Sequence, residues 1–599
     1  MKLFVNKLRS QHVIKILSIF SLSLLITFFL ASYASAKTWY VRPAGGNYGT
    51  EDGTSYENAW DGLLNVVWDS GGVQPGDSLY ICGTHVYKMD GSKPGMWDGS
   101  DAADIHLKGG SDENSIVTLR GDYPSDPGII YNGYIMNYKD WELVPNTNGK
   151  VYKVQFIGNH EWYPFFEKID SNAYKLMKYD GLENITTNPG TYYAESFKGD
   201  NWLYVHCYDS GNPTGRILFS EYGYDFIFGT ESYITIKNME FYQVEKFFNF
   251  DTDKNLSHIR IENCKLIHGD GHLIPIYLGY NNIEIINCEI AFGGNGIYTI
   301  TGNEPTGPSN CVFSGNYIHD IGIVYQNGDA HGIGIQGGNN NIIEKNIIEN
   351  SGTGITLYAY SQQELKNTII RYNIVKNTHS LGGANNRGIE TQCSNEAWAD
   401  KTGNKIYYNI VFNCTTGYRF TFEKLLEFYN NIASNCNIGI CIQRSYFDGD
   451  KTVGPKVKGR NNVVIGSNDQ HVYFQTGAYK PDYVFDWDYN HYYPDGSQKF
   501  YFDDKAISGY LSDFDVWKSR GNDNNGPDIT DPHFVDSIQG NFHTASASSP
   551  VINAGTNVGL SKDFEGNPID GLPDIGAYEF SGTMSNTPTP PTGLRVSFY

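Results

Sequence analysis

The sequence predicts an all-β fold, a single-stranded parallel β-helix in which short strands stack coil upon coil, and three observations predict it. First, an Asn closes an apolar alternation repeatedly between residues 257 and 443, with steps of 22 to 36 residues that are typical of solenoid coils. Second, a Gly-Ile strand follows most of these turns. Third, no stretch keeps a helical period, whereas 66 Gly and 45 Tyr suit short strands joined by tight turns. The repeated asparagines are Asn263, Asn287, Asn316, Asn346, Asn373, Asn409 and Asn431.

We interpret these asparagines as scaffold, because an Asn side chain bonds neighbouring backbone groups and tolerates left-handed backbone geometry at a sharp corner. Two cysteine pairs recur in the same register, Cys264 with Cys288 and Cys414 with Cys436. Equivalent residues on successive coils stack at strand spacing, about 4.8 Å, so a buried column of small side chains is expected. A disulfide within one pair stays open as an alternative for an exported protein.

The first 36 residues have the organisation of a signal peptide. Basic residues precede an apolar run from Ile16 to Ala31, and Ala34-Ser35-Ala36 supplies a small-residue cleavage pattern. A membrane anchor is the alternative, but the apolar run is near the lower limit for spanning. We therefore expect a secreted or cell-surface protein, with no membrane span after signal cleavage.

The charge of the chain limits its partners. A net charge of −22 leaves no basic footprint for nucleic acid, so no nucleic-acid partner is expected. The same charge opposes an acidic polymer unless bound cations bridge the two, which leaves calcium open as a cofactor. No CxxC or His-rich spacing predicts a zinc site. Nothing in the sequence indicates an oligomer, so a monomer is expected.

Residues 37–135 are expected to cap the open end of the solenoid and to form its first coils. Their WYVRP opening, the later GDSLYICGTHVY and the IVTLRGDYPSDPGII stretch at Ile116–Ile130 resemble the start of secreted right-handed parallel β-helix proteins, the pectin-lyase-like group. The resemblance implies right-handed coiling, parallel β-helix repeats and a carbohydrate-related role for the chain.

Residues 136–229 break the coil rhythm and predict a compact β-rich insert. Trp202, Tyr204 and Tyr192 are candidates for stacking on sugar rings along one wall of a substrate cleft. The alternative is a flap that only covers the side of the helix. Residues 230–580 are assigned to the main coils and a C-terminal cap, with DFEGNPIDGLPDIGAYEF as that cap. Residues 581–599 are expected to be a Pro/Thr linker and the start of a further module.

Chemistry is expected on the Gly-Ile strands, because the residues that alternate with the inward Ile point outward and align in columns. Within about four coils this alignment places acids, an imidazole and guanidinium groups on one face. The candidate catalytic residues are Asp329, His331, Arg387 and Glu390, and the candidate substrate-binding residues are Tyr298, Gln336, Tyr358, Gln392, Arg419 and Gln443.

Each candidate has a structural alternative. Arg387 and Glu390 could form only a salt bridge, and His331 could be a turn histidine. Arg419 opposite Glu390 could be an exposed cross-strand pair, worth well under about 1 kcal/mol. The functional interpretation rests on the concentration of these groups, and on Gly334, which we expect to leave room for a ligand.

Two reactions fit such a row. In hydrolysis one carboxyl protonates the leaving oxygen while another activates water or attacks carbon. In β-elimination a base removes the proton next to a uronate carboxylate, and Arg or a cation stabilises the developing charge. HGIGIQG at residues 331–337 resembles a polygalacturonase strand, but the Asp pair and the R-I-K segment of those enzymes are missing here.

The sequence therefore favours a polysaccharide-active enzyme, with a glycoside hydrolase preferred slightly over a polysaccharide lyase. The alternative is a non-catalytic carbohydrate-binding or adhesion solenoid on a cell surface.

Overall fold

The computed structural model describes most of the chain after the predicted signal peptide. The described residues are 36–86, 107–131, 134–135, 140–156, 165–169, 172–197, 200–219, 231–242, 255–269, 272–301, 305–322, 329–360, 363–379, 386–393, 400–421, 425–443, 453–475, 482–503, 508–580 and 582. The predicted signal peptide (apart from residue 36) and the predicted linker (apart from residue 582) lie outside them.

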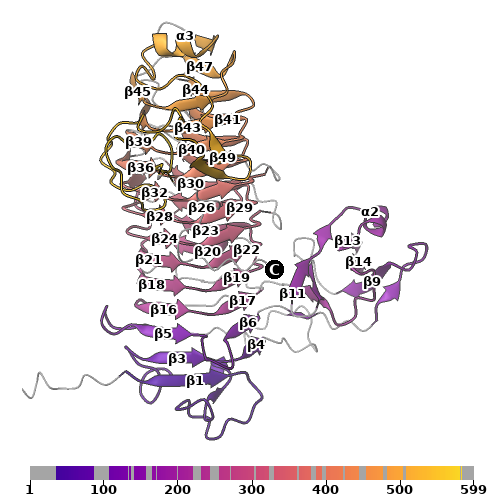
Figure 1. Ribbon diagram of the computed structural model, residues 1–599. Coiled ribbons are helices and arrows are strands. Elements are labelled where there is room, and N and C mark those ends of the chain that lie inside the picture. The colour runs from indigo at the N-terminus through magenta and orange to yellow at the C-terminus, as the bar shows by residue number, and fades with distance from the viewer. Residues whose placement is uncertain are drawn as a thin grey trace, which may run out of the picture.

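Three long sheets of parallel strands run along the molecule, and from residue 257 to residue 503 each coil adds one strand to each sheet in turn (Figure 1). Sheet 1 contains, in spatial order, β2 (Trp60–Asp61), β1 (Thr38–Arg42), β3 (Ser78–Ile81), β5 (Val117–Arg120), β16 (Ile234–Lys237), β18 (Ser257–Glu262), β21 (Asn281–Ile286), β24 (Val312–Ser314), β28 (Ile342–Glu344), β32 (Ile369–Arg371), β36 (Asn404–Tyr407), β39 (Leu426–Tyr429), β42 (Val453–Arg460) and β45 (Asp482–Asp488). Sheet 2 contains β4 (Thr84–Val86), β6 (Ile129–Tyr131), β17 (Glu240–Tyr242), β19 (Lys265–Ile267), β22 (Glu289–Ala291), β25 (Tyr317–His319), β29 (Ile347–Glu349), β33 (Ile374–Lys376), β37 (Ile410–Phe412), β40 (Ile432–Ser434), β43 (Val463–Ile465) and β46 (His491–Tyr493).

Sheet 3 carries the candidate site. Its strands are β20 (His272–Tyr277), β23 (Asn295–Ile300), β26 (His331–Gln336), β30 (Thr353–Ala359), β34 (Arg387–Cys393), β38 (Thr416–Thr421), β41 (Ile438–Gln443), β44 (Gln470–Gln475), β47 (Phe500–Asp503) and β48 (Ser508–Leu511). All neighbours pair in parallel except β47 and β48, which are antiparallel. The short strands β27 (Gly338–Asn339), β31 (Glu364–Lys366) and β35 (Asp400–Thr402) add a fourth side to three coils.

The Gly-Ile pattern has a packing explanation. The Ile and Leu side chains of these strands, such as Ile333 and Ile355, are fully buried between the sheets. Each is worth about 1.5–3 kcal/mol on burial. The preceding Gly sits where the coil turns inward: a Cβ on Gly354 would lie 2.3 Å from Cγ1 of Val375 and 2.6 Å from the carbonyl oxygen of Gly388. A larger residue there would push neighbouring coils apart.

A buried asparagine ladder joins sheets 1 and 2. In each rung the side-chain Oδ1 accepts from the backbone N–H and the Nδ2 of the rung before it, over 2.9–3.1 Å. The ladder runs through Asn316, Asn346, Asn373, Asn409, Asn431, Asn462 and Asn490. The interpretation of the asparagines as scaffold holds for these residues.

Two of the asparagines predicted for this ladder occupy a different position. Asn263 and Asn287 have positive φ and form the left-handed corner, while the next residues, Cys264 and Cys288, take the interior place. The first ladder bond runs from the backbone N–H of Cys288 to Oδ1 of Asn316, over 2.9 Å. The two properties expected of one asparagine, backbone bonding and left-handed geometry, are therefore divided between adjacent columns.

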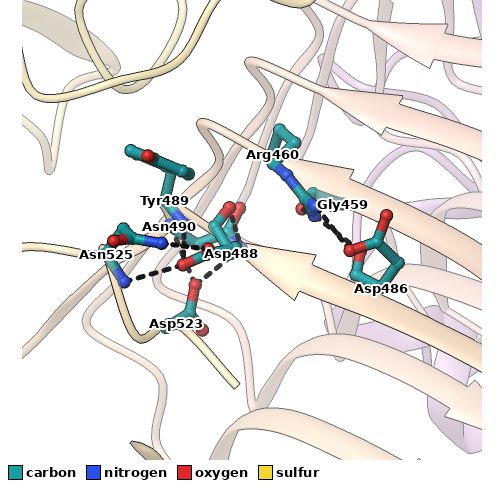
Figure 2. Close-up of polar contacts among 8 residues, drawn as sticks. All are labelled: Gly459, Arg460, Asp486, Asp488, Tyr489, Asn490, Asp523 and Asn525. Carbon is teal, nitrogen blue, oxygen red and sulfur yellow. Dashed lines mark hydrogen bonds and ion pairs between the residues drawn. The ribbon is translucent and has the colours of Figure 1, made fainter. Parts of the chain in front are cut away.

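The ladder ends in a carboxylate (Figure 2). Oδ1 of Asp523 accepts from both the N–H and Nδ2 of Asn490, each at 2.9 Å. Its Oδ2 accepts from Tyr492 Oη (2.7 Å) and Trp517 Nε1 (2.9 Å). Asp523 is fully buried, and that burial raises its pKa. A carboxylate suits this place because the last rung must accept hydrogen bonds but has no further coil to donate to.

The cysteines whose state the structure gives are free and buried: Cys82, Cys207, Cys264, Cys288, Cys311, Cys414, Cys436 and Cys441. The predicted column of small side chains is therefore present in both pairs, and neither pair forms a disulfide.

The strands described between residues 134 and 219 form two sheets that project from the side of the solenoid (Figure 1). Their strands pair antiparallel, except that Met177–Lys178 pairs in parallel with Thr191–Phe197. One sheet contains β11 (Asn172–Lys175), β10 (Phe165–Ile169), β15 (Ile217–Phe219) and β7 (Tyr134–Ile135). The other contains β12 (Met177–Lys178), β13 (Thr191–Phe197), β14 (Asp200–His206), β9 (Val151–Phe156) and β8 (Glu142–Leu143), beside the helix α2 (Leu182–Thr187). These strands have their own small core around Phe165, Leu203 and Val205.

The C-terminal segment, expected as a cap, packs along the side of the solenoid instead. Phe542, Val551, Ile575 and Tyr578 bury themselves against the outer surface of sheets 1 and 2, and the yellow segment lies beside β36 and β39 in Figure 1. The strands β49 (Phe534–Asp536) and β50 (Asn541–Thr544) form its hairpin. The last coil is closed by α3 (Phe514–Ser519), whose buried Trp517 packs on Phe500 at a ring-centroid distance of 4.8 Å.

Candidate functional site

The strand register of sheet 3 gives the outward columns that the sequence predicts. The central column, called here the sheet 3 row, is Pro275, Tyr298, Gly334, Thr356, Glu390, Arg419, Cys441, Tyr473 and Tyr501. The flanking columns align His331 with Thr353 and Arg387, and Gln336 with Tyr358 and Gln392. Sequence-distant candidates are therefore direct neighbours on one face.

Glu390 is the centre of this face. Its side chain is buried, with 1 % exposed, and its carboxylate Oε2 pairs with Nη1 of Arg387 and, at 3.4 Å, with Nη1 of Arg419. Its Oε1 lies 3.2 Å from Thr356 Oγ1. Burial acts to raise the pKa of Glu390, but the two guanidinium groups outweigh it and hold the pKa below the ordinary value. Glu390 is therefore an ionised, ion-paired group at neutral pH.

His331 stands two strands away from Glu390 and is joined to it through Thr356. Nδ1 of His331 lies 3.0 Å from Thr356 Oγ1, and the backbone N–H of His331 donates to Asn295 Oδ1 over 2.7 Å. Burial lowers the pKa of His331 although Glu390 and Asp329 oppose that shift. The imidazole is consequently neutral at neutral pH and retains a lone pair for accepting a proton.

Tyr298 differs from its predicted role as a sugar-lining residue. Its ring lies between His272 (centroids 4.7 Å apart) and His331 (5.7 Å), nearly parallel to both. A Cβ on Gly334 would meet the Tyr298 ring at 2.5 Å. Gly334 therefore leaves room for the Tyr298 ring, and the expectation that it leaves room for a ligand is wrong. Tyr298 packs against His331 and restricts how that imidazole can turn.

Arg419 has two side-chain partners. Besides Glu390, it contacts Gln443, whose amide oxygen accepts from Nη2 (2.8 Å) and Nε (3.2 Å) when the amide is oriented to satisfy both groups. Its side chain is 12 % exposed, so the alternative of an exposed cross-strand pair is wrong. Burial lowers the pKa of Arg419. Both Arg419 and Arg387, which is 15 % exposed, keep a small reachable surface beside Glu390.

The remaining candidates are less closely joined to Glu390. Gln336 is buried and its Oε1 accepts from the backbone N–H of Thr301 at 3.3 Å. Tyr358 packs edge-on against Tyr360, and both Tyr358 and Gln392 are half-buried. Asp329 is exposed, yet close enough to raise the pKa of both His331 and Tyr298.

Two participants were not among the predicted site residues. Thr356 bridges His331 and Glu390, and Asn295 fixes the His331 backbone. The column alignment contains both positions. Neither side chain carries a charge, so the sequence alone does not mark Thr356 or Asn295 as a site residue.

Two of the three aromatic candidates of the insert lie on its outward side, and the third is buried. Tyr192 is buried in the core of the insert, whereas Tyr193 takes the outward side and stacks on Tyr204 at 5.6 Å. Trp202 lies on the same side as Tyr204, with Nζ of Lys153 4.1 Å from its ring centroid. The assumed outward position is therefore wrong for Tyr192 alone, because side chains alternate between the two faces of a strand and its neighbour Tyr193 points outward.

One group of metal-ligating side chains comes together in the described part of the chain, Glu167 with Cys207 and Asp209. Arg216 pairs with both carboxylates, at 3.2 Å from Glu167 and 2.5 Å from Asp209. A guanidinium in this position supplies the positive charge that a cation would bring, so the group fits an ion-pair cluster. The sheet 3 row itself has no such group among its described residues.

Comparison with known proteins finds a matching family for part of the coils. A family of proteins described as having a right-handed β-helix region matches residues 248–409. The match agrees with the parallel β-helix coils described above and with the right-handed coiling that the resemblance of the first coils implied. No curated protein sequence matches the chain.

Three solved structures illustrate the likeness in fold. A complex of XylC with xylose has a TM-score of 0.45 and 11 % identity over 76 % of this chain and 83 % of that chain. Pectate lyase Pel9A has a TM-score of 0.43 and 12 % identity over 91 % and 97 %. The GH136 lacto-N-biosidase from Eubacterium ramulus has a TM-score of 0.41 and 12 % identity over 76 % and 68 %.

In the described part of the chain, no helix is both long enough and apolar enough to span a membrane.

Proposed function

We propose that this protein is an exported polysaccharide-cleaving enzyme whose active site is the part of sheet 3 around His331. The observation that carries the proposal is the bridge from a neutral imidazole through Thr356 to the ion-paired Glu390. Such a bridge orients His331 as a base. The bridge lies on a sheet face that is long enough to hold several sugar units.

The geometry fits β-elimination of an acidic glycan better than hydrolysis. Glu390 is ionised and enclosed, so it cannot protonate a leaving oxygen, which hydrolysis by a carboxyl pair requires. Asp329 is the reachable carboxyl of the predicted set. In contrast, elimination needs one base and nearby positive charge, which His331 and the two guanidinium groups provide. We therefore prefer a lyase to the hydrolase that the sequence favoured slightly.

The reaction would proceed on a uronate whose carboxylate lies beside Arg387 and Arg419. His331 takes the proton from carbon 5, and that C–H electron pair forms the C4=C5 double bond as the C4–O bond breaks. The imidazolium returns the proton to the departing oxygen, so the products are an unsaturated uronate and a free hydroxyl. The guanidinium groups stabilise the negative charge that develops on the carboxylate.

The test is a panel of neutral and acidic polysaccharides with the full mature chain, assayed with calcium and with a chelator. A lyase produces an ultraviolet-absorbing unsaturated product, whereas a hydrolase produces only reducing ends. We expect the first result on a uronate polymer, and loss of activity with the chelator would show that calcium, left open by the sequence, takes part. Reducing ends without ultraviolet absorbance would contradict elimination.

A second candidate is non-catalytic carbohydrate binding or adhesion. The observation that favours it is that the side chains of the site already contact one another. Glu390 is paired with two guanidinium groups, and both faces of the Tyr298 ring are covered by histidines. Glycan binding without turnover of any polysaccharide in the panel would support this candidate.

A further inference from the structure

Thr356 occupies the position from which one hydroxyl can control the protonation of His331. Its Oγ1 lies 3.0 Å from Nδ1 of His331 on one side and 3.2 Å from Oε1 of Glu390 on the other. The side chain is buried, so water does not compete for either bond. A threonine hydroxyl has one proton to donate and lone pairs to accept with.

The direction of these two bonds follows from the chemistry of Glu390. An ionised carboxylate only accepts, so a bond between Thr356 and Glu390 requires the hydroxyl proton to point at Oε1. The hydroxyl then has only lone pairs to offer His331, and Nδ1 must carry the proton of the second bond. The reverse arrangement would place two oxygen lone pairs 3.2 Å apart in a buried site, without a proton between them.

We propose that Thr356 is a positioning residue that holds neutral His331 in its Nδ1–H form, with the Nε2 lone pair directed at the substrate. This inference rests on the proposed function for its catalytic meaning, because Nε2 is then the atom that accepts the substrate proton. No hydrogen bond joins Nε2 to any residue that the structure describes, and 7 % of His331 remains exposed. Tyr298 stacks on the imidazole and thereby restricts the orientation of the His331 ring plane.

Four charged or titratable groups influence this imidazole. Glu390 and Asp329 favour its protonated form, whereas burial and Arg387 favour the neutral form; Tyr298 covers one face of the ring. Thr356 adds no charge, and its role is separable from theirs because it selects between two neutral forms.

The test compares Thr356→Val, which keeps the shape but removes the hydroxyl, with Thr356→Ser, which keeps the hydroxyl. Nitrogen NMR of protein labelled at histidine reports which ring nitrogen carries the proton, and the His331 signals are assigned by their loss in His331→Gln. We expect the Nδ1–H form in the wild type and in Thr356→Ser, and a shift toward the Nε2–H form in Thr356→Val. A wild-type His331 in the Nε2–H form would overturn the proposal, even if the valine variant does not fold.

The kinetic arm uses the substrate found in the glycan panel. In Thr356→Val we expect kcat to fall about tenfold or more with KM little changed, because the base is present in the wrong form. Thr356→Ser should stay within about twofold of the wild type. An unchanged kcat in the valine variant would contradict the positioning role. If no glycan is turned over, the proposed function fails, while the NMR result still decides the protonation of His331.

Discussion

The asparagine ladder and the sheet 3 row are both columns of stacked residues, and they are built in opposite ways. The ladder repeats one residue from Asn316 to Asn490, and every rung makes the same bonds. Between Tyr298 and Arg419 the sheet 3 row changes at every coil, through Gly334, Thr356 and Glu390. Repetition serves a structural need that is the same on each coil. A stretch of a column whose members differ and contact one another is where a solenoid can build a site.

The largest expected effect comes from interrupting the ladder. In Asn409→Ala, the N–H and Nδ2 of Asn373 lose their acceptor, and the carbonyl oxygen of Ile370 loses its donor. Each buried group left without a partner costs about 1–3 kcal/mol, so we expect a loss of roughly 4 kcal/mol. Chemical denaturation measures it. A loss below roughly 1 kcal/mol would show that the ladder contributes little.

Next in size is Glu390→Gln in the sheet 3 row. Removing the charge leaves two partly buried guanidinium groups without their carboxylate, and we expect a loss of roughly 3 kcal/mol near neutral pH. The folded pKa of Glu390 is depressed, so its stabilisation is complete above the unfolded value, about 4.3, and is lost as pH falls through the folded pKa.

The pH dependence gives a separate measurement of the same variant. The difference in free energy of unfolding between wild type and Glu390→Gln should shrink as the pH is lowered below about 4. A difference that is independent of pH would mean that the carboxylate is not ionised in the folded protein.

A smaller effect is expected at the end of the ladder. In Asp523→Asn the new amide must present an N–H to either Asn490 or the Trp517 and Tyr492 donors. An amide N–H at position 523 that is directed at two other donors leaves those donors without an acceptor, and we expect this to cost roughly 1–2 kcal/mol of stability. Thermal unfolding would detect this loss, and a stabilised variant would contradict the argument that the last rung needs only acceptors.

The smallest effect is expected at an exposed corner. Asn377 has φ 54° and accepts a 2.9 Å bond from Asn413 on the surface. Asn377→Gly keeps the left-handed geometry and removes only this exposed bond, so we expect a change below roughly 0.5 kcal/mol. It is the matched control for Asn409→Ala, and a comparable loss in both would remove the distinction between buried ladder and exposed corner.

The coil architecture and the register of sheet 3 could be predicted because Gly-Ile strands mark equivalent positions on each coil. Two kinds of detail could not. Asn263 and Asn316 look alike in sequence, yet one forms a left-handed corner and the other bonds inside, and only the register separates adjacent positions. Likewise, the pattern of the strand shows that Glu390 points outward, but its burial depends on groups from other coils.

Sequence also gave no measure of how the candidates connect. Asp329, His331 and Glu390 were predicted together because they carry charge or can titrate, whereas the bridge between the last two is the uncharged Thr356. The preference for hydrolysis follows from the acidic chain, which shows no obvious basic floor for a uronate polymer in its sequence. The enclosure of Glu390 by Arg387 and Arg419 changes that preference.

The central claim, that the chemistry lies on sheet 3 around His331, beside the sheet 3 row, is tested most directly by comparing the turnover of His331→Gln with that of His319→Gln. His319 serves as the control, because it too is linked to a carboxylate, in this case directly to Asp320 at 2.7 Å from its Nδ1, but it lies on sheet 2. With both variants shown to be folded, we predict a loss of kcat of about 100-fold or more for His331→Gln and wild-type turnover for His319→Gln. Wild-type turnover by folded His331→Gln would contradict the account.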